Sequence, residues 1–283
     1  MKKNQILAGV AGLAFVSTLS FTSAALADDD KLEQLKSQGF ARVAIANEPP
    51  YTAVSADGKV SGAGPDVARA IFKKLGVPDI VASVSEYGAM IPGIQARRFD
   101  AVTAGLFMKP ERCGAVAYSE PILCDAEGFL VKKGNPKGFK AYKDIAKDSS
   151  ATVGVPGGGL QEKMALAAGV PRDRVIVAPD AQGGLKMLQD GRIDLYALPM
   201  LSLNDLKKKA ADETIEVVAP VADAPVGCDG TAFNKADTAL RDAYDVELAK
   251  MKKSGEFAKI IEPYGFSADV AMSTSREKLC AAN

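Results

Sequence analysis

The sequence contains no histidine in 283 residues, and its charge is balanced, with 35 basic and 35 acidic side chains. Without an imidazole the chain cannot build a Ser-His-Asp or Cys-His catalytic centre, a histidine metal site or an imidazole proton shuttle. The lack of a basic excess argues against a dedicated nucleic-acid-binding protein, because binding to phosphates needs one. No motif typical of hydride, phosphate or nucleotide chemistry occurs either, so we expect no cofactor.

What is present suits a globular protein, since 47% of the residues are apolar and 25% are charged. These proportions allow a hydrophobic core and differ from those of disordered, collagen-like or coiled-coil chains. A single core stops growing near about 250 residues, so a chain of this length favours two domains.

The N-terminal segment has the pattern of a secretory signal peptide. Lys2 and Lys3 precede a mostly apolar stretch over residues 6–19, and Ala25-Leu26-Ala27 matches the small-residue cleavage pattern. A membrane anchor is the alternative, but the apolar stretch is shorter than the roughly 20 residues that a spanning helix needs. No cysteine lies at the cleavage point, which excludes lipid attachment there. We therefore predict a signal peptide over residues 1–27 and a soluble mature protein in the periplasm.

Export to an oxidising compartment makes two disulfides the expected state of the four cysteines, Cys113, Cys124, Cys228 and Cys280. Three pairings exist, and the sequence alone does not decide between them. We favour Cys113–Cys124 with Cys228–Cys280, because only ten residues separate the first two and both remaining cysteines lie late in the chain. Unpaired cysteines in the core are the alternative. A metal site is not expected, because no CxxC spacing occurs and no histidine can assist.

Helical and strand patterns alternate through the mature chain. We predict strands at residues 42–46, 80–84, 101–104, 152–155, 175–178 and 195–198. We predict helices at residues 66–75, 89–96, 160–168, 184–189, 201–210, 240–253 and 256–264. This alternation is typical of α/β domains with mostly parallel sheets and helices on both faces. Because Gly134-Asn135-Pro136 separates two such series, we expect two lobes with a cleft between them, and the best candidates for crossing strands are residues 127–131 and 218–226.

Polar and aromatic residues gather directly after the predicted strands, where parallel sheets bind their ligands. The loop Asn47-Glu48-Pro49-Pro50-Tyr51 follows the first strand, Glu86-Tyr87-Gly88 follows the second, and residues 105–112 follow the third. Two prolines stiffen the first loop, so its acidic and aromatic side chains are presented rather than mobile. In the second series Gly157-Gly158-Gly159 leads straight into a helix, whose free first-turn amides attract anions.

Four stretches in this order resemble the polar amino-acid class of periplasmic substrate-binding proteins of ABC importers: EPPYTAVSADGKVSGAGPDVA, YGAMIPGIQARRFDAVTAG, KPERCGAVAYSEPIL and DGRID. The resemblance covers essentially the whole mature chain. It implies a type II-like fold whose first lobe comprises residues 28–128 and 223–283, with an inserted second lobe over residues 129–222 and two hinge strands. It also implies a monomer that closes on a small ligand and docks on permease subunits in the inner membrane.

Departures from that class indicate which ligand is bound. Amino-acid-binding members carry an arginine that grips the α-carboxylate, and this chain keeps it as Arg112. They usually have a small residue, often serine, at the position of Phe107, and an acid for the α-ammonium group at the position of Pro199. The ammonium-binding acid is therefore missing from the second lobe, and an additional aromatic residue has entered the first.

The motifs are very similar to those of the ectoine/hydroxyectoine-binding proteins of bacterial ABC uptake systems. The similarity implies a compact zwitterionic ligand, with three aromatic faces around its flat cation, each contributing roughly 0.5–2 kcal/mol. It implies that Glu48 accepts N–H bonds from that cation, while Arg112 and the glycine-loop amides take the carboxylate. That family usually has Ser or Thr at the position of Leu160, so a side-chain hydrogen bond is lost there and the backbone amide remains. The implied ligand-binding residues are Glu48, Tyr51, Tyr87, Gly105, Phe107, Arg112, Gly159 and Leu160.

Other interpretations stay open at the level of sequence. The aromatic residues could be packing residues, the glycine run a plain tight turn and Glu48 a solvated loop acid. Arg112 could form an ion pair with Glu111 or Glu120. The ligand could be a betaine or another amino acid. An exported dehydratase of cyclic carboxylates, with Glu48 in acid-base catalysis, is a further alternative, although the lack of histidine and the aromatic lining argue against an enzyme.

Overall fold

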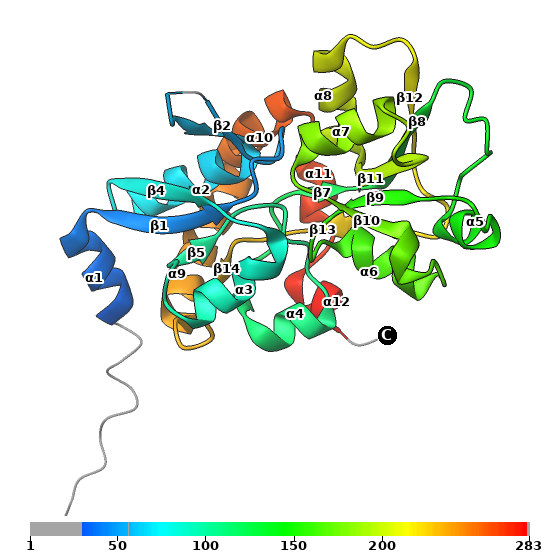
Figure 1. Ribbon diagram of the computed structural model, residues 1–283. Coiled ribbons are helices and arrows are strands. Elements are labelled where there is room, and N and C mark those ends of the chain that lie inside the picture. The colour runs from blue at the N-terminus through cyan, green and yellow to red at the C-terminus, as the bar shows by residue number, and fades with distance from the viewer. Residues whose placement is uncertain (1–29, 56, 282–283) are drawn as a thin grey trace, which may run out of the picture.

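The computed structural model describes residues 30–55 and 57–281. The predicted signal peptide, residues 1–27, lies outside this part of the chain. Figure 1 shows two α/β lobes that lie side by side, each built around its own sheet. None of the helices in the described residues combines the length and the hydrophobicity of a membrane span.

The first lobe is built on a five-stranded sheet with the order β4-β1-β5-β14-β6. Its strands are β4 (Asp79–Val84), β1 (Phe40–Ile45), β5 (Ala101–Val102), β14 (Ala232–Phe233) and β6 (Ala117–Tyr118). β1 is parallel to β4 and β5, whereas β14 is antiparallel to β5 and β6. The end of β1 is a fully buried apolar run, as is typical of a strand covered on both faces.

Helices from both ends of the chain cover this sheet. They are α1 (Asp30–Gln38), α2 (Ala63–Lys74), α3 (Tyr87–Gln95), α4 (Pro110–Ala115), α9 (Thr238–Ser254), α10 (Glu256–Ile261), α11 (Ala268–Met272) and α12 (Arg276–Cys280), with the 3-10 turn η2 (Glu262–Tyr264) and the hairpin β2 (Ala53–Val54) and β3 (Val60–Ser61). The Tyr244 ring of α9 packs on Phe72 of α2, with 5.7 Å between ring centroids, and on Phe233 of β14, with 5.3 Å. The C-terminal part of the chain therefore completes the core of the first lobe.

The second lobe is built on a sheet with the order β10-β9-β11-β8-β12. Its strands are β10 (Val175–Ala178), β9 (Val153–Pro156), β11 (Leu195–Pro199), β8 (Glu127–Lys132) and β12 (Ile215–Val218). Its helices are α5 (Tyr142–Lys147), α6 (Leu160–Ala167), α7 (Ala181–Gln189) and α8 (Met200–Ala210), with the 3-10 turn η1 (Arg172–Arg174). β9 is parallel to β10 and β11, whereas β8 is antiparallel to β11 and β12.

The two-lobed α/β fold is thus confirmed, with mixed rather than mostly parallel sheets. In each sheet one strand runs antiparallel to its neighbours, and it is the first strand after the chain crosses from the other lobe. This strand is β8 in the second lobe and β14 in the returning part of the first lobe. Each predicted strand and helix has an observed counterpart whose ends differ by a few residues. The sequence pattern missed mainly short elements such as α4, β7 (Cys124–Asp125) and β13 (Gly227–Cys228), because so few residues carry no clear periodicity.

The chain crosses between the lobes at β7 and β13, which pair with each other in a small antiparallel sheet at the centre of the molecule (Figure 1). The predicted crossing strand at residues 127–131 is therefore wrong, and the one at residues 218–226 is misplaced, because residues 219–226 form no strand and only link β12 to β13. Residues 127–131 belong to β8 inside the second sheet, and Val218 is the last residue of β12. An apolar run is as typical of a buried sheet strand as of a crossing strand, so the pattern did not separate the two.

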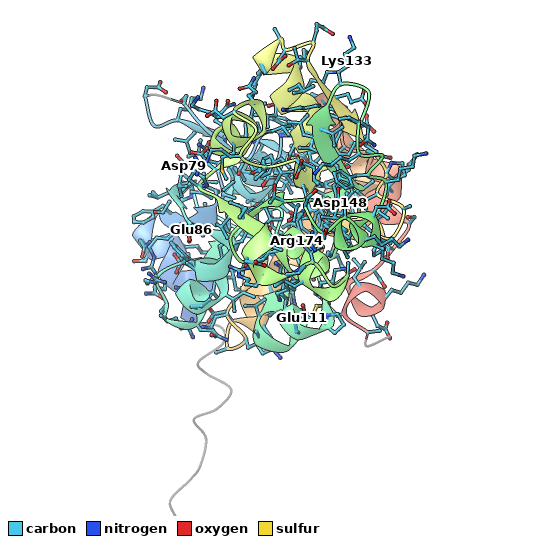
Figure 2. The ribbon with its side chains drawn as sticks, turned by 45° about the vertical axis from the view of Figure 1, so that its right-hand side comes forward. Asp79, Glu86, Glu111, Lys133, Asp148 and Arg174 are labelled. Carbon is cyan, nitrogen blue, oxygen red and sulfur yellow. A yellow bond between two sulfur atoms is a disulfide. The ribbon has the colours of Figure 1, made fainter. Side chains whose placement is uncertain are left out.

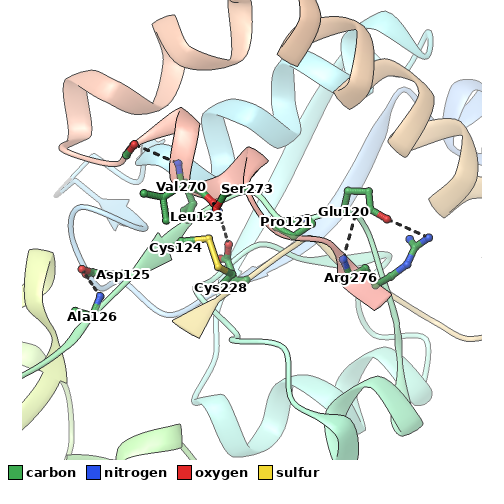
Figure 3. Close-up of a disulfide and its surroundings, with 12 residues drawn as sticks. Glu120, Pro121, Leu123, Cys124, Asp125, Ala126, Cys228, Val270, Ser273 and Arg276 are labelled. Carbon is green, nitrogen blue, oxygen red and sulfur yellow. Dashed lines mark hydrogen bonds and ion pairs between the residues drawn. A yellow bond between two sulfur atoms is a disulfide. The ribbon is translucent and has the colours of Figure 1, made fainter. Parts of the chain in front are cut away.

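The favoured disulfide pairing, Cys113–Cys124 with Cys228–Cys280, is also wrong. The structure joins Cys124 to Cys228 and Cys113 to Cys280. Cys124 and Cys228 lie directly opposite each other on β7 and β13, with their Cα atoms 4.0 Å apart (Figure 3). Cys113 on α4 meets Cys280 on α12. Nearness in sequence was a poor guide, because the fold brings together cysteines that are 104 and 167 positions apart.

Candidate functional site

Loops from both sheets meet in a small cavity between the lobes. Its lining from the first lobe comes from the loops after β1 and β5, from the first residue of α3 and from α4, namely Glu48, Tyr87, Gly105, Phe107 and Arg112. Its lining from the second lobe comes from the start of α6 and the end of β11, namely Gly159, Leu160, Gln161 and Pro199. All of the residues predicted to bind ligand except Tyr51 line this cavity. Its volume is about 10 Å³, which is room for about one water molecule, so a larger ligand requires the lobes or the lining to move apart.

Glu48 presents a buried carboxylate to the cavity, with only 5% of the residue exposed. Its Oε1 accepts a hydrogen bond from Ser202 Oγ on α8 (2.7 Å), and its Oε2 accepts one from Tyr87 Oη (3.2 Å). Burial raises the pKa of Glu48 to about 7; the two hydrogen bonds lower this pKa, and the charge of Asp125 raises it. Glu48 is therefore no solvated loop acid, and a nearby cation would stabilise its ionised form.

Arg112 is the buried cation of the cavity lining. Its Nη1 donates to the carbonyl oxygen of Phe107 (2.9 Å), and its Nη2 reaches that of Gly158 in the second lobe (3.4 Å). In the described part of the chain Arg112 forms no ion pair. The two acids that the sequence offered as partners pair elsewhere, Glu111 with Lys163 and Glu120 with Arg276. A buried guanidinium without a carboxylate partner is suited to an anionic group of a ligand.

Two aromatic rings line the cavity, and the third predicted ring stands one layer away. Phe107 is 2% exposed and packs on the backbone of β13, where a Cβ on Gly227 would lie 2.2 Å from the Phe107 ring. Tyr51 lies beside Phe107, with 6.2 Å between ring centroids, and donates its hydroxyl hydrogen to Asp125 on β7 (3.2 Å). Phe107 and Tyr87 can therefore contact a ligand in this cavity, whereas Tyr51 supports Phe107 from behind.

The sequence analysis missed a buried pair in the second lobe. Gln161 Nε2 donates to both carboxylate oxygens of Glu127, at 3.1 and 2.9 Å, and both residues are buried. Burial raises the pKa of Glu127 to about 7, although the hydrogen bonds from Gln161 lower it. Glu127 lies opposite Pro199 in the β8–β11 pair. Gln161 lines the cavity and Glu127 does not, so the amide stands between this acid and the cavity.

Carboxylates outnumber cations around this region. Burial raises the pKa of Asp125 to about 6 and that of Asp229 to about 7, so both join Glu48 and Glu127 in a buried acidic cluster. Among the described residues the buried cations are Arg112 and Lys31, and Lys31 already pairs with Asp100 (2.6 Å). An additional positive charge in the cavity would therefore stabilise the ionised acids. The described residues hold no group of three or more side chains arranged to bind a metal ion.

Contacts between the lobes surround the cavity. Gly158 has a φ of +70°, and a Cβ there would lie 2.5 Å from the Cα of Gly88, so this approach of two backbones requires glycine. An ion pair joins Lys163 to Glu111 (3.2 Å), which Figure 2 labels, and both side chains are about half exposed. These contacts show that the lobes are closed on each other.

A second and larger cavity, of about 320 Å³, adjoins the first and shares Glu48 and Tyr87 with it. The remaining first-lobe lining follows β1 and β4 and includes Asn47 and Glu86, the latter labelled in Figure 2. The second-lobe lining includes Asp180 and Tyr196. This larger space contains neither Phe107 nor Arg112 in its lining, so it lacks the opposed cation-binding and anion-binding groups of the small cavity.

Comparison with known proteins gives several relatives of similar length. One solved structure, the crystal structure of EhuB in complex with hydroxyectoine, has 75% sequence identity to this chain. The two structures superpose with a TM-score of 0.90, and the match covers 90% of this chain and 100% of that one. The probable amino-acid ABC transporter periplasmic-binding protein y4tE of Sinorhizobium fredii is 36% identical over 87% of this chain and 83% of its own length. An ancestral amino acid-binding protein described as a precursor of cyclohexadienyl dehydratase is 26% identical, with a TM-score of 0.72, over 83% of this chain and 99% of that one.

The match at the level of the family extends over most of the chain. Residues 41–268 match the bacterial extracellular solute-binding proteins, family 3. This range includes both sheets and the whole cavity lining described above. The chain therefore belongs to the bacterial extracellular solute-binding proteins, family 3.

Proposed function

We propose that this protein is the periplasmic receptor of an ABC importer and that it captures ectoine and hydroxyectoine. The observation that carries the proposal is the opposition, within one closed cavity, of a buried acid beside aromatic rings and a buried arginine without an acidic partner. The 75% identity to a protein crystallised with hydroxyectoine supports the same ligand class. The proposed ligand is thus a compact ring that carries a delocalised cation and a carboxylate.

In the proposed complex the two ends of the zwitterion bind different groups of the first lobe. Glu48 accepts N–H bonds from the cationic ring, and the faces of Phe107 and Tyr87 each contribute roughly 0.5–2 kcal/mol. Arg112 binds the carboxylate with the donors that it does not direct at backbone carbonyls. The amides at the start of α6, those of Gly159 and Leu160, complete the carboxylate site.

The proposal also covers processing, location and partners. Residues 1–27 act as a cleaved signal peptide, and the mature monomer works in the periplasm. Its first lobe comprises residues 28–128 and 223–283, and its second lobe comprises residues 129–222. The lobes separate to admit the ligand, because the cavity of about 10 Å³ is too small for a ring. The closed form delivers the ligand to the permease in the inner membrane.

Titration calorimetry on the mature protein tests the ligand. We expect tight binding of ectoine and hydroxyectoine, and weak or no binding of common amino acids. Tight binding of a common amino acid together with no binding of either ectoine would reject the proposal.

The Glu48→Gln variant separates ectoines from betaines as ligands. A quaternary ammonium group offers no N–H, so Glu48→Gln should change betaine binding little. For ectoine we expect a loss of about 2–4 kcal/mol, because an ionised acceptor is replaced by a neutral one. An unchanged affinity for ectoine would remove Glu48 from the cation site.

We propose further that the protein is a receptor and not an enzyme. The similarity to a precursor of a dehydratase makes cyclic carboxylates the substrates to examine. Incubation with prephenate and arogenate should leave both compounds unchanged. Formation of a dehydrated product would overturn this part of the proposal.

A further inference from the structure

Ser202 connects the second lobe to the acid that we assign to the ligand's cation. It lies in the first turn of α8, is 2% exposed, and donates its hydroxyl hydrogen to Glu48 Oε1 (2.7 Å). The bond spans the lobes, because α8 packs on β8, β11 and β12 of the second sheet, whereas Glu48 follows β1 of the first. The second lobe therefore contributes a neutral donor to an acid of the first lobe.

The position of Ser202 is fixed by a second carboxylate. The amide of Leu201 donates to Asp125 Oδ2 (2.8 Å), and Asp125 belongs to β7 between the lobes. The same oxygen accepts the Tyr51 hydroxyl (3.2 Å). The first turn of α8 is thus docked on a strand of the lobe crossing, and the backbone of α8 sets the distance from Ser202 to Glu48.

The groups around Glu48 explain why the Ser202 hydroxyl group affects the ionisation of this acid. Glu48 faces the acids Asp125 and Glu127, the hydroxyl groups of Tyr51, Tyr87 and Tyr196, and Arg112 across the cavity. Its carboxylate accepts hydrogen bonds from Tyr87 within the first lobe and from Ser202 across the cleft. Burial raises the pKa of Glu48 to about 7, and each of these donors lowers it. Each donor therefore favours the carboxylate form near neutral pH.

We propose that Ser202 is a positioning residue that keeps Glu48 ionised and oriented for the ligand's cation through the hydrogen bond that it donates across the cleft. The inference rests on the proposed function, in which Glu48 accepts N–H bonds from a cationic ligand.

The pH dependence of ectoine binding tests the inference. Calorimetry between pH 6 and 9 would compare the wild type with Ser202→Ala and Ser202→Thr. In the wild type the affinity should rise with pH through about 7, because the carboxylate form of Glu48 accepts N–H bonds from a cation more strongly than the protonated form does. Loss of the Ser202 donor should raise the pKa of Glu48, move this rise up by about one pH unit and lower the affinity at pH 7 about three- to tenfold.

Two comparisons make this test specific to Glu48. Ser202→Thr keeps a hydroxyl group and should retain the wild-type profile. In the Glu48→Gln background, Ser202→Ala should cause no further shift with pH. The inference is overturned by a loss of affinity in Ser202→Ala that is equal at every pH, or by a pH shift that persists in Glu48→Gln.

A measurement without ligand separates this inference from the proposed function. If the wild type binds neither ectoine nor hydroxyectoine, the proposed function fails. The titration of the Glu48 carboxyl carbon by ¹³C NMR then judges Ser202 alone. A higher midpoint in Ser202→Ala, but not in Ser202→Thr, supports the positioning role, and equal midpoints in all three proteins contradict it.

Discussion

The two lobes contribute to the cavity in different ways. The first lobe supplies its charged and aromatic side chains, Glu48, Tyr87, Phe107 and Arg112, whereas none of the second-lobe lining residues is charged. The buried acid of the second lobe, Glu127, is already engaged by Gln161 through both oxygens. The difference indicates that the first lobe binds the charged groups of the ligand and that the second lobe mainly closes over them. Both charged groups of a zwitterion can bind to the first lobe, one to Glu48 and the other to Arg112. The second lobe then excludes water from the cavity and holds these side chains in place.

The largest effect is expected from Arg112→Ala. Removal of this guanidinium would leave the ligand's carboxylate buried without a partner, and we expect a loss of about 2–5 kcal/mol in binding free energy by calorimetry. Lys163→Ala is the matched control, because Lys163 also bridges the lobes but its ion pair with Glu111 is about half exposed. Exposed pairs contribute about 0–1 kcal/mol, so this control should stay near wild type. Equal losses in the two variants would mean that Arg112 acts in closure and not in recognition.

Phe107→Ser should cost less, roughly 1–3 kcal/mol of binding free energy, through lost cation–π contact and packing. Tyr51→Phe serves as its comparison, since Tyr51 lies outside the cavity lining and would lose only its hydrogen bond to Asp125. We expect that variant to keep most of the affinity for ectoine. An unchanged affinity in Phe107→Ser, measured in the same titrations, would remove the ring from the site.

Titration of Glu48 should affect both ligand affinity and stability, whereas titration of Glu127 should affect mainly stability. Glu48 and Glu127 both have a pKa raised to about 7 by burial, so the folded state binds their protons more tightly than the unfolded state. Stability without ligand should therefore fall as pH rises from about 4 to 7, by about 1–3 kcal/mol between pH 5 and 8 in denaturant unfolding. Glu127→Gln should reduce this fall and leave ectoine affinity within about threefold. A flat stability profile in the wild type would contradict the buried acidic cluster.

The smallest effect is expected from Leu160→Thr in the second lobe. Leu160 is 9% exposed and packs in the core cluster that contains Phe107 and Tyr51, so the change removes apolar burial while it adds a hydroxyl group near the carboxylate site. These effects oppose each other, and we expect a net change in binding free energy of less than about 1 kcal/mol. A gain or loss well above that would show that the second lobe takes part in recognition.

The sequence predicted the first lobe's contribution better than the second's. Glu48 and Phe107 lie in loops directly after strands, Arg112 lies in the short helix α4 just beyond, and a recognisable motif surrounds each of them. Ser202 was missed because it lies in an apolar helical pattern next to Leu203, and nothing in that pattern shows which residue of the other lobe it will meet. The contact depends on how two sheets are placed relative to each other.

Long-range pairing also explains the errors at the crossing between the lobes. Cys124 and Cys228 meet because β7 and β13 pair, and each of these strands is only two residues long. A strand of that length has no alternation to detect. Two acids at the edge of an apolar run, Asp125 and Glu127, were the available signal that this segment borders a polar cavity.

A crystal structure with bound ectoine tests the central claim most directly. We predict the ring against Phe107 and Tyr87, an N–H of the ring within hydrogen-bond distance of Glu48, and the carboxylate on Arg112. A ligand held instead in the adjoining cavity, beside Asp180 and with Phe107 and Arg112 out of reach, would contradict the account.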